Sequence, residues 1–304
     1  MNSLQTPKAT IKDSSDGYPV VRWFNTDTGR FQENKVKQLL QPGDSNTKLN
    51  KNDIKTFGLS LSPSTESGYG NTCASASKGC KGACLDHQGL ASVFSRIREA
   101  RKAKTVLFYT DRPRFLAMLE KEIRTKIKTG KTRGHDIAFR LNVFSDIRWE
   151  KYLPADLLCD NSQNFRFYDY SKHYKRVLKS DCGYIRPNYH LTFSRSETNE
   201  SETLNLLDAG NSAAVVFARV PLPKTWNGFP VIDGDKTDLR YLDDSILYQE
   251  HLQLFGGFVV GLKLKGASND EKRRAINSGF AIDNTGGIVQ DERLVLPAKE
   301  VNAF

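Results

Sequence analysis

The chain has 304 residues, of which 38% are hydrophobic and 26% charged, and its formal net charge is +10. This length suits one barrel-sized domain or two smaller ones, and the composition is typical of a soluble globular protein. No apolar run approaches the roughly 20 residues that span a membrane. The N-terminal stretch MNSLQTPKATIKDSS lacks the apolar core of a signal peptide. We therefore expect a cytoplasmic protein with no membrane partner.

The pattern of apolar residues predicts an N-terminal arm followed by alternating strands and helices. Residues 1–50 are rich in Asn, Asp, Ser, Thr, Lys and Gln, which predicts a loosely ordered arm with one short strand at 19–24. Residues 51–304 are expected to form one domain. Its predicted strands are 57–62, 137–143, 164–170, 189–193, 213–218 and 257–264, and its predicted helices are 91–104, 112–129, 149–158 and 200–209.

Strands that alternate with helices indicate parallel pairing through helical crossovers. At this length the leading fold is an α/β (β/α) barrel or partial barrel, TIM-like, with an N-terminal extension; a doubly wound open sheet is the second choice. No G-x-G-x-x-G follows a strand and no G-x-x-x-x-G-K-[ST] is present, so dinucleotide and P-loop sites lack support.

Several predicted strands alternate polar with apolar residues instead of being apolar throughout. Successive strand residues point to opposite faces, so these strands would present polar rows on one face of the sheet. That face is either a polar barrel lumen with a small-molecule ligand or a solvated edge of the sheet. The candidate site residues, at or near the carboxyl ends of strands, are Arg140, Asn142, Asp146, Asp169, Lys172, His190, Ser194, Glu197 and Lys263.

The stretch NTCASASKGCKGACLDHQG, residues 71–89, holds three of the five cysteines as C-x6-C-x3-C. A [4Fe–4S] cluster held by Cys73, Cys80 and Cys84 would leave one iron open. Zinc is the alternative metal, with His87 as a fourth ligand. A redox thiol pair and unrelated thiols are the two remaining interpretations. The isolated Cys159 and Cys182 are expected to be ordinary packed thiols.

Nearly all of the positive charge lies just after the cysteine stretch. Residues 96–133 contain 13 Lys and Arg against 4 Asp and Glu, a net charge of +9. At helical spacing, these residues form either a solvated helix surface or an electrostatic footprint for nucleic acid. The aromatic residues that would stack on bases are not interleaved with them.

Several blocks of the sequence resemble a known family. The stretch SGYGNTCASASKGCKGACLDHQG is followed in order by DRPRF, RLNVFSDIRWE, FRFYDYSK, RPNYHLTFSRSETN, VIDGDKTDLR and VVGLKLKG. Together these blocks, over 57–266, resemble the phage "gene product 88-like" family of uncharacterised proteins. The resemblance implies a phage-encoded protein that works in the cytoplasm of the bacterial host.

That family is in turn distantly similar to radical SAM enzymes, which carry a three-cysteine loop after the first strand of a partial (β/α) barrel. The similarity implies that Cys73, Cys80 and Cys84 hold a [4Fe–4S] cluster whose open iron binds S-adenosylmethionine. Two features depart from that pattern. The usual C-x3-C-x2-C spacing is longer here, and RLNVFSD stands where those enzymes have the Gly-Gly-Glu that holds the methionine amine.

Two functions follow as hypotheses. The first is an iron–sulfur barrel protein, with a redox or radical activity as one option. The second is a non-enzymatic nucleic-acid-binding phage protein whose metal, zinc or iron–sulfur, only stabilises the cysteine loop.

Overall fold

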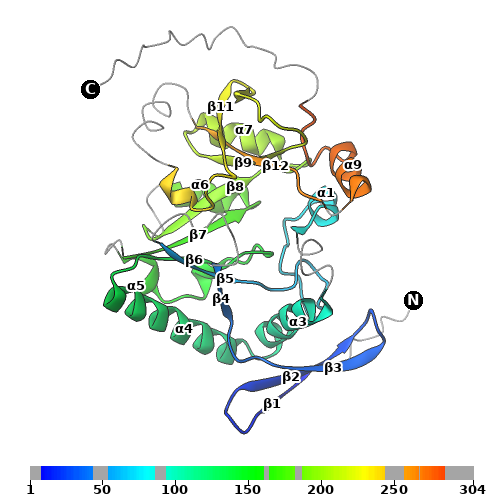
Figure 1. The fold of residues 1–304 in the computed structure, drawn as a ribbon, viewed down its shortest axis with the longest axis vertical. Helices are drawn as coiled ribbons and strands as arrows, with labels where there is room; N and C mark the ends of the chain where they lie inside the picture. The colour runs from blue at the N-terminus through cyan, green and yellow to red at the C-terminus, as the bar shows by residue number, and fades with distance from the viewer. Residues whose placement is uncertain are drawn as a thin grey trace.

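The computed structural model describes residues 8–43, 54–85, 94–160, 164–181, 187–243, 257–266 and 268–284. They form a three-stranded sheet near the N-terminus and a nine-stranded sheet with helices packed on it (Figure 1). This is a mixed α/β fold, as the alternating pattern predicts.

The N-terminal sheet is more regular than the predicted arm. It contains β1 (Thr10–Asp13), β2 (Pro19–Asn25) and β3 (Arg30–Lys35), paired antiparallel in chain order. The sequence indicated one strand here because only β2 alternates clearly: Val21 and Trp23 are buried, and both belong to the main hydrophobic core. Its neighbours are short and polar and are held by hydrogen bonding to β2.

The large sheet contains β4 (Leu40–Pro42), β5 (Lys55–Leu59), β6 (Ile137–Arg140), β7 (Phe165–Ser171), β8 (Tyr189–Ser194), β9 (Ala213–Phe217), β10 (Thr225–Trp226), β11 (Phe229–Asp233) and β12 (Val259–Lys263). The spatial order is β10-β11-β12-β9-β8-β7-β6-β5-β4. The strands β5, β6, β7, β8, β9, β12 and β11 are parallel to one another, and the edge strands β4 and β10 are antiparallel to their neighbours.

A closed TIM-like barrel is not what forms. Within the described part of the chain no pairing joins β4 to β10, so the sheet stays open. The chain does not add its strands in order beyond β9. It passes through β10 and β11 first, and β12 then inserts between β11 and β9, so the sheet ends on a short antiparallel hairpin.

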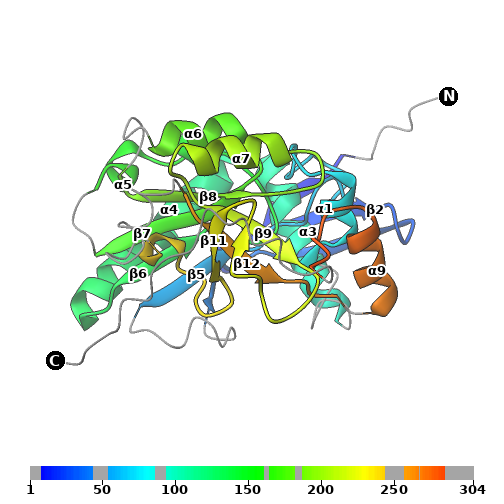
Figure 2. The same ribbon diagram turned by 90° about the horizontal axis from the view of Figure 1, so that it is seen from above.

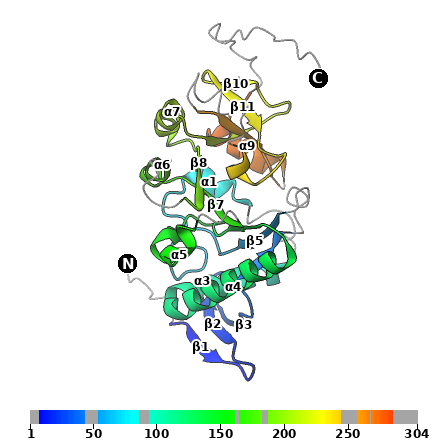
Figure 3. The ribbon, with the colours of Figure 1, turned by 90° about the vertical axis from the view of Figure 1, so that its left-hand side faces the viewer.

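The helices follow the strands. They are α1 (Lys78–Gly82), α3 (Ser95–Thr110), α4 (Arg112–Arg133), α5 (Ala155–Leu158), α6 (Tyr174–Asp181), α7 (Glu200–Asp208) and α9 (Asn269–Asn277), with 3-10 turns η3 (Trp149–Lys151) and η4 (Arg240–Leu242). From β5 to β9, each strand lies beside the next one in the chain. Right-handed crossovers in one direction place their helices on one side, and Figures 2 and 3 show α5, α6 and α7 there.

The two faces of the sheet therefore differ. We call the side covered by α4, α5, α6 and α7 the helix face; it carries fully buried Phe139, Phe167, Phe193 and Val215, which belong to the main core. The opposite side is the η4 face, where Leu239 of the segment leading into η4 packs on strand residues. The polar residues predicted from the sequence are divided between the two faces: Arg140 and His190 lie on the η4 face, and Asn142 and Asp169 lie on the helix face.

Candidate functional site

The cysteine loop leaves the carboxyl end of β5 and crosses to the ends of the neighbouring strands. Thr72 Oγ1 donates to the Ser62 carbonyl oxygen at 2.7 Å, and the Thr72 carbonyl oxygen accepts from the Asp146 backbone N–H at 2.8 Å. The Cys73 thiol donates to the Phe144 carbonyl oxygen at 3.3 Å. The first cysteine is therefore attached to the segment that follows β6.

The second cysteine is carried by α1, and Glu197 holds the start of that helix. Glu197 accepts from the Gly79 backbone N–H at 2.7 Å and from Ser77 Oγ at 2.8 Å, and Ser77 in turn caps the Cys80 N–H at 3.1 Å. Burial alone would raise the pKa of the Glu197 carboxyl. The hydrogen bonds from Gly79 and Ser77 outweigh burial, so this pKa is lowered. The carboxylate follows β8, so a second strand end positions the loop.

The start of α1 is crowded. A Cβ atom added at Gly79 would lie 2.7 Å from a Glu197 carboxylate oxygen and 2.8 Å from both Phe280 Cβ and Ser278 Oγ. Figure 2 shows α1 beside α9, which ends just before these last two residues. Only glycine fits where these segments meet.

The three loop thiols are half-buried and none of them forms a disulfide. Burial raises the pKa of the Cys73 thiol, and the charges of Asp146 and Cys80 add to this effect. Among the residues that the structure describes, no three His, Cys, Asp or Glu side chains are arranged to hold a metal ion. His87 and Cys182 lie outside those residues, and Cys159 is exposed, not packed as expected.

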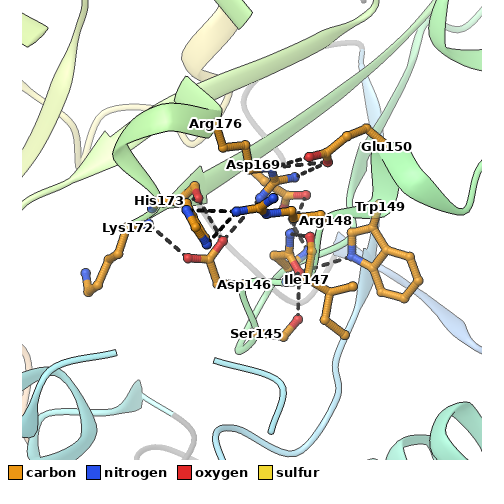
Figure 4. Close-up of polar contacts among 12 residues, drawn as sticks. Ser145, Asp146, Ile147, Arg148, Trp149, Glu150, Asp169, Lys172, His173 and Arg176 are labelled. Carbon is orange, nitrogen blue, oxygen red and sulfur yellow. Dashed lines mark hydrogen bonds and ion pairs between the residues drawn. The ribbon is translucent and has the colours of Figure 1, made fainter. Parts of the chain in front are cut away.

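Asp146 connects the cysteine loop to β7 and α6. Its carboxylate accepts from Ser171 Oγ at 2.8 Å, from the Lys172 backbone N–H at 2.9 Å and from Arg176 Nη1 at 3.1 Å (Figure 4). Arg176 also makes three contacts of 2.8 to 3.1 Å with the Glu150 carboxylate. Through Asp146 and Glu150, the SDIRWE block, residues 145–150, therefore joins the end of β7 and the start of α6.

Asn142 and Asp169 form a buried pair on the helix face. Asp169 accepts from the Asn142 backbone N–H at 2.7 Å, from Asn142 Nδ2 at 3.2 Å and from Tyr189 Oη at 2.5 Å. Asn142 Oδ1 accepts from Trp149 Nε1 at 3.0 Å. Burial raises the pKa of the Asp169 carboxyl to about 7, although these donors and nearby Arg176 oppose the shift. Asn142 Oδ1 also accepts from Ser145 Oγ at 2.8 Å and from the Ile147 backbone N–H at 2.9 Å, so the pair holds the segment that follows β6.

Other predicted residues lie near α1. Lys172 Nζ donates to Ser194 Oγ at 2.6 Å and lies 5.7 Å from the centre of the Phe280 ring. Lys172 also contributes to lowering the pKa of Glu197, so the two charges are neighbours. The structure thus brings Asp146, Lys172, Ser194 and Glu197 together around the cysteine loop.

Three predicted residues lie elsewhere. Arg140 and His190 are on the η4 face, where Arg140 Nη1 donates to the Asp238 carboxylate at 2.5 Å. Lys263 is exposed at the end of β12, with its Nζ 3.7 Å from Asp233. In the predicted strand 137–143, Arg140 and Asn142 are two residues apart and would share one face. Instead β6 ends at Arg140, so the alternation of faces stops and Asn142 turns to the helix face.

Much of the basic segment is used inside the protein. Lys102 is buried and pairs with Asp27 at 2.6 Å, and the buried Lys104 donates to the Leu39 carbonyl oxygen at 2.8 Å. The Arg112 guanidinium lies 4.8 Å from the centre of the Phe108 ring. The expectation that this face of α3 is exposed is therefore wrong. Basic side chains that do remain exposed are Arg96, Lys121, Arg124, Lys128, Lys131 and Arg133.

Sequence reasoning did not single out Thr72, Tyr170, Arg176 or Arg240. Thr72, Tyr170 and Arg240 lie in the quoted blocks and Arg176 lies outside them, but none of these residue types by itself suggests a buried role. Arg240 is only 1% exposed, and its position in a polar loop gave no signal of burial.

Within the described ranges, no helix is both long and apolar enough to cross a membrane. Searches of curated proteins and of solved structures returned no significant match. They therefore lend no support to the distant similarity to radical SAM enzymes. A profile of the family described as Gene product 88 matches residues 32–284, most of the chain. The sequence resemblance to the phage gene product 88-like proteins is thereby confirmed, and the chain belongs to the gene product 88 family.

Proposed function

We propose that this phage protein binds an iron–sulfur cluster through Cys73, Cys80 and Cys84 at the carboxyl edge of its parallel sheet. The observation that carries the proposal is the way the loop is anchored. Contacts from the segment after β6 hold Cys73, and a carboxylate after β8 holds the helix that bears Cys80. Ligand sites of parallel α/β sheets form at this edge.

The donor set suits the cluster. Thiolates are its standard protein ligands, and three of them leave one iron of a [4Fe–4S] cluster open to a ligand. Because the three sulfurs are not grouped around one point, binding requires the loop to close around the metal. Half-buried thiols and a segment of Gly, Ser and Ala leave room for that movement.

The residues beside the loop carry polar groups that could contact a ligand of the cluster. Lys172, Ser194 and Glu197 offer a cation, a hydroxyl and a carboxylate at the edge where the open iron would lie. The strand order from β5 to β9 is also that of a (β/α) barrel, and we consider the fold a partial barrel. A cluster would supply electron transfer or substrate binding in the host cytoplasm; a radical reaction with S-adenosylmethionine is the more specific form.

The test is anaerobic purification followed by iron and sulfide analysis and visible absorption. We expect about four iron and four sulfide per chain and a brown protein. Cys80→Ser should lose most of the iron, whereas the exposed Cys159→Ser, a matched control, should keep it. A colourless protein that binds one zinc per chain would contradict the proposal. If the reduced protein neither binds nor cleaves S-adenosylmethionine, only the radical form fails.

A further inference from the structure

Buried hydrogen-bond donors without acceptors gather on the η4 face. Among the described residues these are Nε of Arg140 at the end of β6, Oη of Tyr170 near the end of β7, and Nη1 of Arg240 in η4. Native proteins rarely leave such atoms unsatisfied, and each one calls for an explanation.

The two arginines are held in place by other contacts. Arg140 gives Nη1 to Asp238 at 2.5 Å and lies 5.0 Å from the centre of the Tyr170 ring. Arg240, 1% exposed, donates Nη2 to the Thr237 carbonyl oxygen, and its Nε lies 3.2 Å from Asp243. The unsatisfied atoms therefore belong to fixed side chains and not to mobile ones.

The side chains of this cluster are close enough for their charges to act on one another. Burial, followed by the charge of Asp238, raises the pKa of Tyr170, and both Arg240 and Arg140 act in the opposite sense. Burial and then Arg240 lower the pKa of His190 to about 4, so His190 is neutral at pH 7. The Tyr170 hydroxyl thus lies within the field of both guanidinium groups.

Chemistry decides the kind of ligand. Guanidinium nitrogens only donate, and their planar geometry matches the oxygens of phosphate and carboxylate groups. Asp238 and Asp243 already balance the two positive charges, so the ligand is needed for its acceptor oxygens more than for its charge.

We propose that Arg140, Tyr170 and Arg240 form a binding site for a small oxyanion, a phosphate or a carboxylate group, on the η4 face. Tyr170 packs against Val260, and Leu239, next to Arg240, packs against Tyr168. The site uses none of the thiols, and its ligand binds on the face opposite the Asp169 network.

The test is calorimetric titration of the full chain with inorganic phosphate and, separately, acetate, at ionic strength held constant with chloride. Saturable binding of at least one is expected. Tyr170→Phe removes only the hydroxyl and should weaken binding about tenfold, the effect of one hydrogen bond to a charged group. Tyr18→Phe, at an exposed tyrosine, is the matched control and should bind as the wild type does.

Binding of phosphate alone or acetate alone identifies the source of the oxyanion. No binding of either would mean that ordered water fills the cluster, and it would overturn the proposal. Unchanged binding by Tyr170→Phe would also overturn it, because the oxyanion would then bind elsewhere. Arg240→Lys, if folded, should bind more weakly than Tyr170→Phe. Cys80→Ser should leave binding intact, which separates this site from the proposed cluster.

Discussion

Replacing Glu197 with alanine should loosen α1 without unfolding the protein. The substitution removes the acceptor for the Gly79 N–H and for Ser77 Oγ, at 2.7 and 2.8 Å. Hydrogen bonds to a charged group contribute about 1.5–3 kcal/mol each. Glu197 is half-exposed, so water replaces part of each bond and the lower figure applies. Two such bonds give about 3 kcal/mol, which is roughly a 100-fold increase in local opening.

Amide hydrogen exchange of the segment around 77–83 measures this opening directly, and the alkylation rate of Cys80 provides a second readout. Glu197→Gln retains an oxygen for Gly79 and should fall between the alanine variant and the wild type. Glu202→Ala, an exposed carboxylate early in α7, is the matched control and should change neither rate. If Gly79 in a folded Glu197→Ala protein exchanged within twofold of the wild-type rate, the anchoring of α1 by this carboxylate would be refuted.

Three further predictions concern pH and charge. Burial lowers the pKa of Lys104 to about 8 in the folded protein. Between pH 8 and about 10.5 the unfolded chain therefore holds one more proton than the folded protein, so the free energy of unfolding should rise with pH across that range. Denaturant titrations of Lys104→Met should not show this rise. Burial raises the pKa of Asp169 to about 7. From about pH 4 to 7 the folded protein therefore holds one more proton than the unfolded chain, so the contribution of Asp169 to the free energy of unfolding should fall as pH rises. If the difference in unfolding free energy between the wild type and Asp169→Asn did not change with pH over this range, the shift would be contradicted. Three exposed lysines of α4 test the nucleic-acid-binding alternative: Lys121, Lys128 and Lys131. If they bind nucleic acid, replacing them with glutamine should weaken the salt-dependent retention of DNA or RNA. Unchanged retention would rule out nucleic-acid binding by this helix.

The sequence predicted the order of the main strands well because their side chains alternate or are continuously apolar. In β8, Tyr189, Leu191 and Phe193 face the main core as expected. The short strands β10 and β11 were missed inside a stretch of Pro, Gly and Asp whose composition is typical of a loop. Their pairing depends on β12, which follows them in the chain, so no local pattern could reveal it.

The site was predictable in its cysteines and only partly in its surroundings. Spacing identified the loop, and position at strand ends identified Asp146 and Glu197. The sequence did not reveal that Asn142 and Arg140 lie on different faces, because this depends on where β6 ends. Nor could charge counting show that Lys102 and Lys104 are buried, because their partners lie in the distant N-terminal region.

The crowding at Gly79 has a consequence for biosynthesis. The start of α1 is enclosed by Glu197 and by Ser278 and Phe280, residues that leave the ribosome long after the loop itself. Contacts so distant in sequence form late, since the intervening chain must first be made and closed. The cysteine loop therefore lacks its full enclosure until residues 278–280 have been synthesised. We therefore expect any group that needs this position to be inserted after these residues have left the ribosome.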